Sequence, residues 1–217
     1  MCWSATADLV AGVGVAAVGV ACTARAPSRR ELPLAALPLL LGAHQIVESA
    51  VWDAGGGSGP ATVVWAVIAL PLLAVWVPAG VLCAAPARAR GRLVLLLAVG
   101  AATAAVLAYD LATGPVTAEI RGRTIGYALD VPHPAVLVSG YLLATVGSLL
   151  LSGDRRLRGL GIVVAVGALL CWALWRLAFV STWCAFAAVC SVMLLGWVRA
   201  LAASARAGAR ADLSRRT

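Results

Sequence analysis

The chain of 217 residues contains no lysine, and all seventeen of its basic residues are arginines. Without a side-chain amine, no Schiff base to retinal or to another carbonyl cofactor can form, so a retinal protein is excluded. Charged residues are also scarce, at 12% of the chain compared with about 25% in soluble proteins. Together with 62% hydrophobic residues and a mean hydropathy of +0.96, this composition predicts an integral membrane protein.

The six cysteines lack the CxxC spacing of a zinc ribbon. Four of them lie in apolar runs, where a free thiol behaves as a small hydrophobic side chain. Cys2 and Cys184 lie in polar surroundings instead. If Met1 is removed, the amine and thiol of Cys2 could bind a metal or act as a nucleophile. An exposed thiol or a disulfide to Cys184 are the alternatives.

The apolar residues fall into blocks close to the ~20 residues that span a bilayer. We expect an all-α fold with seven transmembrane helices in one domain, residues 1–201, followed by an Arg/Ala-rich tail, residues 202–217, that is a frayed helix or disordered. Pro71 and Pro78 predict a kink in the third span, and Gly14 and Gly19 favour close helix packing in the first. The expected spans are about residues 8–24, 33–52, 61–83, 93–109, 135–151, 160–175 and 182–201.

Residues 110–134 form the one long polar connection between spans. Two β-prone runs, 116–120 and 124–129, flank Arg121-Gly122-Arg123 and predict a small hairpin on the membrane surface. Arg121 and Arg123 could bind a headgroup phosphate, although solvated arginines are the simpler interpretation.

The distribution of arginine predicts the orientation. Fourteen of the seventeen arginines lie in the loops after spans one, three and five or toward the C-terminal tail. Positive residues stay on the cytoplasmic side and meet anionic headgroups. We therefore expect a multi-pass bacterial plasma-membrane protein with its N-terminus outside and its C-terminus inside. Membrane lipids are the expected partners, rather than nucleic acid, and a membrane-protein partner or a homo-oligomer stays open.

One stripe of the second span carries His44, Glu48 and Trp52, which are four residues apart and therefore share a helix face. An ionisable pair inside a span is costly and is by default a hypothesis of a functional site. A His/Glu pair at this spacing can bind one divalent transition metal. The alternative is a structural His–Glu hydrogen bond with Arg176 as counter-ion.

Other polar residues fall on the same outer side as this stripe. His133 lies between two prolines and is interpreted as a surface residue rather than a ligand. The candidates for a further metal ligand are Cys2, Asp110 and Cys184, and the other outer-face candidates are Trp52, Tyr109, His133, Arg176 and Thr182.

Three stretches of the chain carry a family resemblance: residues 1–7, which read Met-Cys-Trp-Ser-Ala-Thr-Ala, together with 32–48 and 181–188. They resemble an uncharacterised bacterial, largely actinobacterial, family of small seven-span integral membrane proteins that typically begin Met-Cys-Phe-Ser-Ala. Trp3 stands where the family has Phe and keeps an aromatic side chain there. The resemblance extends over all seven spans and implies the architecture, while the family is a domain of unknown function.

Two kinds of function fit these patterns. The first is a membrane protein with an outward-opening polar site around His44 and Glu48, acting as a sensor, a small-ligand binder or a transport component. The second is a metal-dependent or redox membrane enzyme that acts on a lipid or small amphiphile, with Cys2 or Cys184 as a further ligand or nucleophile. Whether the protein is an enzyme is left open by the sequence.

Overall fold

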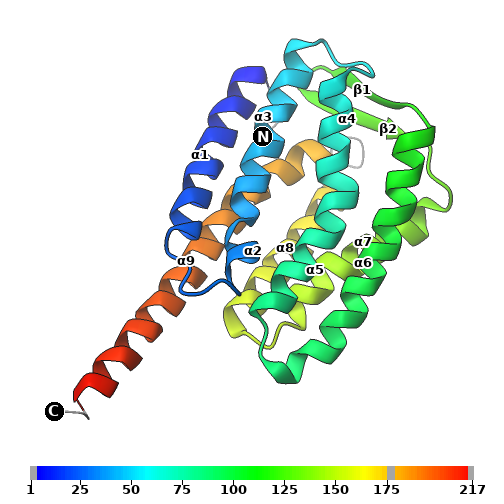
Figure 1. Cartoon of the computed structure of the whole chain (residues 1–217). Helices are drawn as coiled ribbons and strands as arrows, with labels where there is room; N and C mark the ends of the chain where they lie inside the picture. The colour runs from blue at the N-terminus through cyan, green and yellow to red at the C-terminus, as the bar shows by residue number, and fades with distance from the viewer. Residues whose placement is uncertain (1–3, 175–178, 215–217) are drawn as a thin grey trace.

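The computed structural model describes residues 4–174 and 179–214, apart from the side chains of residues 171–185, 212 and 213 (Figure 1). Helices dominate, and one two-stranded sheet closes one end of the bundle (Figure 1). The helices are α1 (Ala5–Thr23), α2 (Leu32–Ala35), α3 (Leu37–Asp53), α4 (Pro60–Val67), the π-helix η1 (Ile68–Leu72), α5 (Leu73–Ala84), α6 (Ala87–Thr113), α7 (Pro134–Leu150), α8 (Arg155–Leu174) and α9 (Phe179–Ser214).

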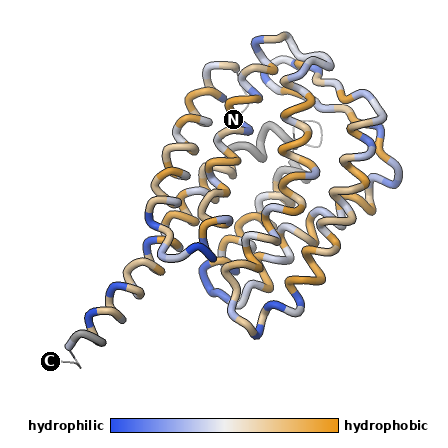
Figure 2. The backbone as a smooth tube through the Cα atoms, in the orientation of Figure 1, coloured by the Kyte–Doolittle hydropathy of each residue, from blue (hydrophilic) through white to orange (hydrophobic). Residues whose placement is uncertain are grey.

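Five helical segments of the described chain are long and apolar enough to cross a membrane: Ala5–Thr23, Leu32–Asp53, Pro60–Ala84, Ala87–Thr113 and Phe186–Ala211. The helix α7 is apolar and shorter. Hydrophobic residues run along the bundle and hydrophilic ones gather at its ends (Figure 2). Large apolar side chains such as Val10, Leu95 and Val136 are exposed on its surface, as expected for contact with lipid rather than water. The membrane class is thus supported, and the number of seven spans stays a prediction.

The second and third expected spans are irregular at their prolines. The second is broken at Ala36, because Pro38 has no N–H to donate to the preceding turn, and α3 starts afresh at Leu37. In the third, Pro71 lies in the π-helical turn η1 between α4 and α5. A π-turn removes the clash that a proline ring makes in an α-helix. Pro78 lies inside α5.

The helices α1 and α3 approach each other closely through glycines. A Cβ added to Gly42 would lie 2.6 Å from the backbone nitrogen of Ala16 and 2.7 Å from the carbonyl oxygen of Gly12. Gly19 makes a similarly close approach to Leu39, whereas a Cβ on Gly14 would meet nothing within 4 Å. Close packing of the first span is therefore confirmed at Gly19, but Gly14 faces away from the neighbouring helix.

The predicted hairpin is present, with β1 (Val116–Arg121) and β2 (Thr124–Leu129) paired antiparallel in register from Val116–Leu129 to Arg121–Thr124. The hairpin is also held against the helices. A backbone bridge between Gly57 and Ala118 ties it to the loop before α4, and Ala118 and Ile125 pack with Val51 and Trp65 in one apolar cluster. The hairpin is therefore attached to the ends of α3 and α4.

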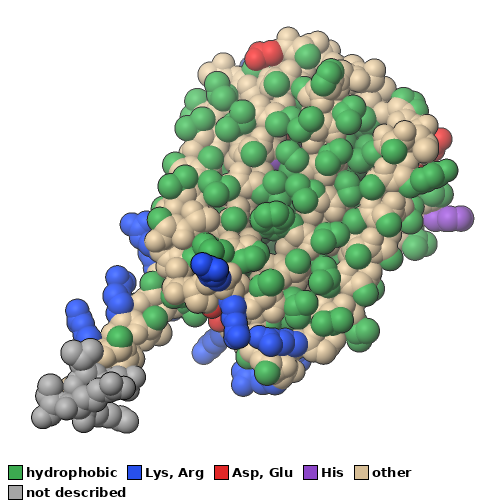
Figure 3. All heavy atoms as spheres, in the orientation of Figure 1, with side chains coloured by type: hydrophobic (Ala, Val, Ile, Leu, Met, Phe, Trp, Pro, Cys, Tyr) green, Lys and Arg blue, Asp and Glu red, His purple; other side chains and the backbone are tan. Residues whose placement is uncertain are grey.

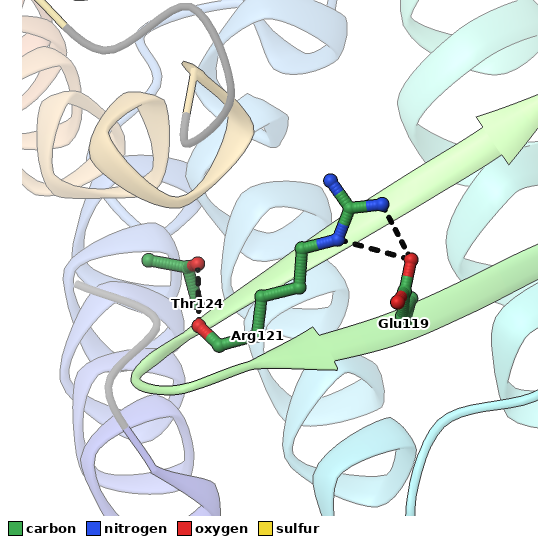
Figure 4. Close-up of polar contacts among 3 residues, drawn as sticks. All are labelled: Glu119, Arg121 and Thr124. Carbon is green, nitrogen blue, oxygen red and sulfur yellow. Dashed lines mark hydrogen bonds and ion pairs between the residues drawn. The ribbon is translucent and has the colours of Figure 1, made fainter.

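The turn of the hairpin carries an exposed ion pair. The Nε of Arg121 donates to a carboxylate oxygen of Glu119 at 3.0 Å, and the hydroxyl of Thr124 donates to the carbonyl of Arg121 (Figure 4). The Glu119 carboxylate raises the pKa of Arg121 through this hydrogen bond. Because Glu119 already partners it, Arg121 is a poor candidate for a phosphate ligand.

The described part of the tail, residues 202–214, is helical, and a helix is one of the two states expected for the tail. The helix α9 crosses the expected domain boundary at residue 201 without a break and continues to Ser214. Its C-terminal part projects from the bundle at the end opposite the hairpin (Figure 1). Arginine side chains gather at this same end (Figure 3). The two ends of the molecule therefore differ sharply in charge.

Candidate functional site

The stripe on α3 lies near the hairpin end of the bundle, and two of its three residues are buried. The side chain of Glu48 is completely buried and that of His44 is 7% exposed. Each of the three residues contacts a different element: α4 for His44, β2 for Glu48 and α1 for Trp52. The three residues lie within the continuous helix α3, as the sequence predicted. The contacts of each side chain depend on the element that packs against it.

His44 lies against Trp65 of α4, with ring centroids 5.0 Å apart and an angle of 40° between the ring planes. Trp65 is 4% exposed. Within the described part of the chain, neither the Nε2 of His44 nor the Nε1 of Trp65 has a hydrogen-bond partner, and both atoms are buried. Each such unsatisfied polar atom costs about 1–3 kcal/mol of stability, so two adjacent ones call for an explanation.

Glu48 lies under the hairpin. The hydroxyl of Tyr127, on β2, donates to the Oε1 of Glu48 at 3.3 Å. The Tyr127 ring also stacks on Trp65, with centroids 3.4 Å apart and an interplanar angle of 4°. Trp65 is therefore in contact with His44 and with Tyr127, and the hairpin covers the site with an aromatic ring and a hydroxyl group.

Trp52, the third residue of the stripe, reaches across to α1. Its Nε1 donates to the Oδ2 of Asp8 at 2.8 Å, and the Asp8 side chain is completely buried. This bond joins the helix that carries the stripe to α1.

Asp8, Trp65 and Tyr127 were not among the candidate site residues expected from the sequence. Asp8 had the same signal as Glu48, a carboxylate within an apolar run, and could have been found from it. Trp65 and Tyr127 had none, because an aromatic residue within a span or strand is ordinarily part of the core. Their role follows from the docking of the hairpin.

The expected metal ligands are not brought together in the described residues. In that part of the chain, no group of three or more His, Cys, Asp or Glu side chains could hold a metal ion. Asp110, on α6, is half-buried, and its Oδ2 has no hydrogen-bond partner among the described residues. Cys2 and Arg176 lie outside the described residues, as do the side chains of Thr182 and Cys184. Metal binding by His44 and Glu48 with Cys2 or Cys184 therefore stays a prediction.

Two other outer-face candidates lie on the surface. Tyr109 is 67% exposed near the end of α6. His133 is exposed and precedes α7 in a left-handed conformation, with φ of 49°. The exposed position of His133 agrees with its interpretation from the sequence as a surface residue. Neither residue contributes to the cluster around α3.

Comparison with known proteins gives one match. A family model described as a family of unknown function, DUF6629, matches residues 1–209. No curated protein and no solved structure matches the chain significantly. The resemblance to an uncharacterised family is therefore confirmed, and the chain belongs to DUF6629.

Proposed function

For this member of a family without an assigned activity, we propose a seven-span plasma-membrane protein that binds a small polar ligand beside His44 and Glu48. The observation that carries the proposal is the pair of buried nitrogens, His44 Nε2 and Trp65 Nε1, which lack partners in the described structure. Binding at this position suits a sensor, a ligand carrier or a component of a transport system.

The five candidate spans and the charge distribution support the membrane arrangement. Adding α7 and α8, of 17 and 20 residues, gives seven helices. At 1.5 Å per residue their lengths approach the ~30 Å of a hydrocarbon core. The arginine-rich end opposite the hairpin fits the cytoplasmic side by the positive-inside rule (Figure 3). The cluster then lies in the outer half of the membrane.

The chemistry of the two nitrogens defines the ligand. An indole N–H can only donate a hydrogen bond, whereas the Nε2 of a neutral imidazole either donates or accepts. A ligand that satisfies both therefore needs at least one hydrogen-bond acceptor, such as the oxygen of a carboxylate, carbonyl or hydroxyl group. Because the two rings lie against each other, with centroids 5.0 Å apart, we expect one small molecule with such an acceptor to bind both nitrogens.

The hairpin controls access in this proposal. Tyr127 stacks directly on Trp65 and bonds to Glu48, so its ring covers the site from the hairpin side. A ligand that enters from the hairpin side displaces Tyr127 in this proposal. We expect the hairpin to shift as a unit, because its two strands are paired along their whole length.

The alternative, a metal-dependent enzyme, would use the same Nε2 of His44 as a metal ligand. It would need further ligands from Cys2 or Cys184. The helix α9, which carries Cys184, packs against α3 and β2. Metal content therefore separates the two functions.

The test begins with native mass spectrometry and metal analysis of the full chain purified in mild detergent. The wild type should retain a small organic molecule, and His44→Ala and Trp65→Phe should each lose it. His133→Ala changes the other histidine, which is exposed, and serves as the matched control. A stoichiometric metal that is lost in His44→Ala and Glu48→Ala would favour the enzyme instead. Absence of both molecule and metal from well-folded wild type would refute the proposed site.

A further inference from the structure

A second feature lies at the opposite, arginine-rich end of the molecule. A hollow of about 730 Å³ opens between residues 24–27, which follow α1, and the projecting part of α9. Three arginines line it, Arg25, Arg199 and Arg206, together with small side chains that include Ala202, Ala205 and Ala209. Nothing in the proposed ligand site uses these residues.

The periodicity of α9 and the packing of α1 on α9 place the three arginines around one hollow. Arg199 and Arg206 are seven residues apart on α9, two helical turns, and therefore lie on the same face. Arg25 comes from the end of α1, where its Nη1 donates to the carbonyl of Ala21 at 3.1 Å and caps the helix. Because α1 packs along α9, the helix pair holds these charges around a common space.

The hollow is kept open by the small residues between the arginines. Ala202, Ala205 and Ala209 are spaced along the lining face of α9, and none of them has a side chain long enough to fill the space. The lining therefore combines a shallow apolar floor with a positively charged rim. Such a surface suits an amphiphile whose charged group meets the arginines.

The positive charge of the hollow is not neutralised within the described protein. No carboxylate lines the hollow. The ion pair formed by described residues, Arg121 with Glu119, is at the hairpin end. Arg25, Arg199 and Arg206 are all exposed, so their guanidinium groups can bind a ligand without breaking an ion pair formed by the described residues. Three like charges around one space favour a bound anion.

We propose that this hollow binds the phosphate group of an anionic ligand. The planar guanidinium group donates two parallel hydrogen bonds to phosphate, which is why arginine suits this anion. Basic clusters directly cytoplasmic of a transmembrane helix bind anionic headgroups, and α9 leaves the bundle at this point (Figure 1). The phosphate can come from a phospholipid headgroup or from a soluble phosphorylated anion.

The test titrates the detergent-purified full chain with short-chain phosphatidylglycerol, phosphatidylcholine or inorganic phosphate and follows occupancy by native mass spectrometry. An arginine near a membrane surface strengthens anionic binding about fivefold. Arg199→Gln/Arg206→Gln should therefore weaken phosphatidylglycerol binding roughly 25-fold. Arg199→Lys/Arg206→Lys keeps the charge but not the two parallel hydrogen bonds, so it should restore only part of the affinity. Raising the salt concentration should weaken binding to the wild type more than to the glutamine variant.

Arg155→Gln/Arg158→Gln is the matched control, since it removes the same charge from exposed arginines that do not line the hollow. It should bind phosphatidylglycerol like the wild type. Effective competition by inorganic phosphate would support a soluble anion, and binding of the lipid without such competition would support a headgroup. Equal losses in the two glutamine double variants, or no loss in Arg199→Gln/Arg206→Gln, would overturn the proposal.

Discussion

The contact between α1 and α3 permits a quantitative test, because it depends on a glycine that has no room for a side chain. A Cβ at Gly42 would lie 2.6 Å from the nitrogen and 2.8 Å from the Cβ of Ala16, and 2.7 Å from the oxygen of Gly12. Two of these three atoms are backbone, so they cannot move as a flexible side chain would. The Gly42→Ala substitution must therefore separate the two helices.

Overpacking of this kind costs about 1–3 kcal/mol. Alanine in place of glycine inside a helix recovers at most about 1 kcal/mol of this. We therefore expect Gly42→Ala to unfold at a lower temperature than the wild type in the same detergent. Separation of the helices should also lengthen the bond from Trp52 to Asp8, which joins them at 2.8 Å.

Gly14→Ala is the matched control for this prediction. It makes the same chemical change on α1, at an exposed position where an added Cβ would meet nothing within 4 Å. Its thermal midpoint should equal or exceed that of the wild type. Midpoints for Gly42→Ala and Gly14→Ala that agree within error would refute the close contact of α1 with α3.

Three further substitutions test individual contacts. Trp52→Phe removes the indole donor from the buried Asp8 carboxylate and should cost about 1.5–3 kcal/mol. Trp76→Phe, which removes an indole donor to a backbone carbonyl, should cost only about 0.5–1.5 kcal/mol by urea or thermal unfolding. Tyr127→Phe keeps the ring stack and removes the hydroxyl group that donates to Glu48 at 3.3 Å, a long hydrogen bond whose loss should contribute at most about 1 kcal/mol of destabilisation. A variant that keeps Cys83 as its single cysteine tests the orientation, because Cys83 is exposed at the end of α5. It should react with an impermeant maleimide only after the cells are opened. Labelling of intact cells would contradict a cytoplasmic position.

The elements of the fold follow from local sequence, because a span or a hairpin depends on residues close together in the chain. The expected strand runs 116–120 and 124–129 differ from β1 and β2 by a single residue. The break at Ala36 was missed, although its cause is also local. A mean hydropathy over twenty residues does not register one absent N–H group at Pro38.

The stripe of His44, Glu48 and Trp52 was determined by the sequence alone, since residues four apart on a helix share a face whatever surrounds it. The partners of these residues were decided by the tertiary structure. Asp8 lies 44 residues from Trp52, and Tyr127 lies 79 residues from Glu48. No local pattern encodes such pairs, because they arise only when α1 packs on α3 and the hairpin docks on the helix ends. The sequence thus determined the membrane class and the buried polar stripe, and packing decided what each polar group meets.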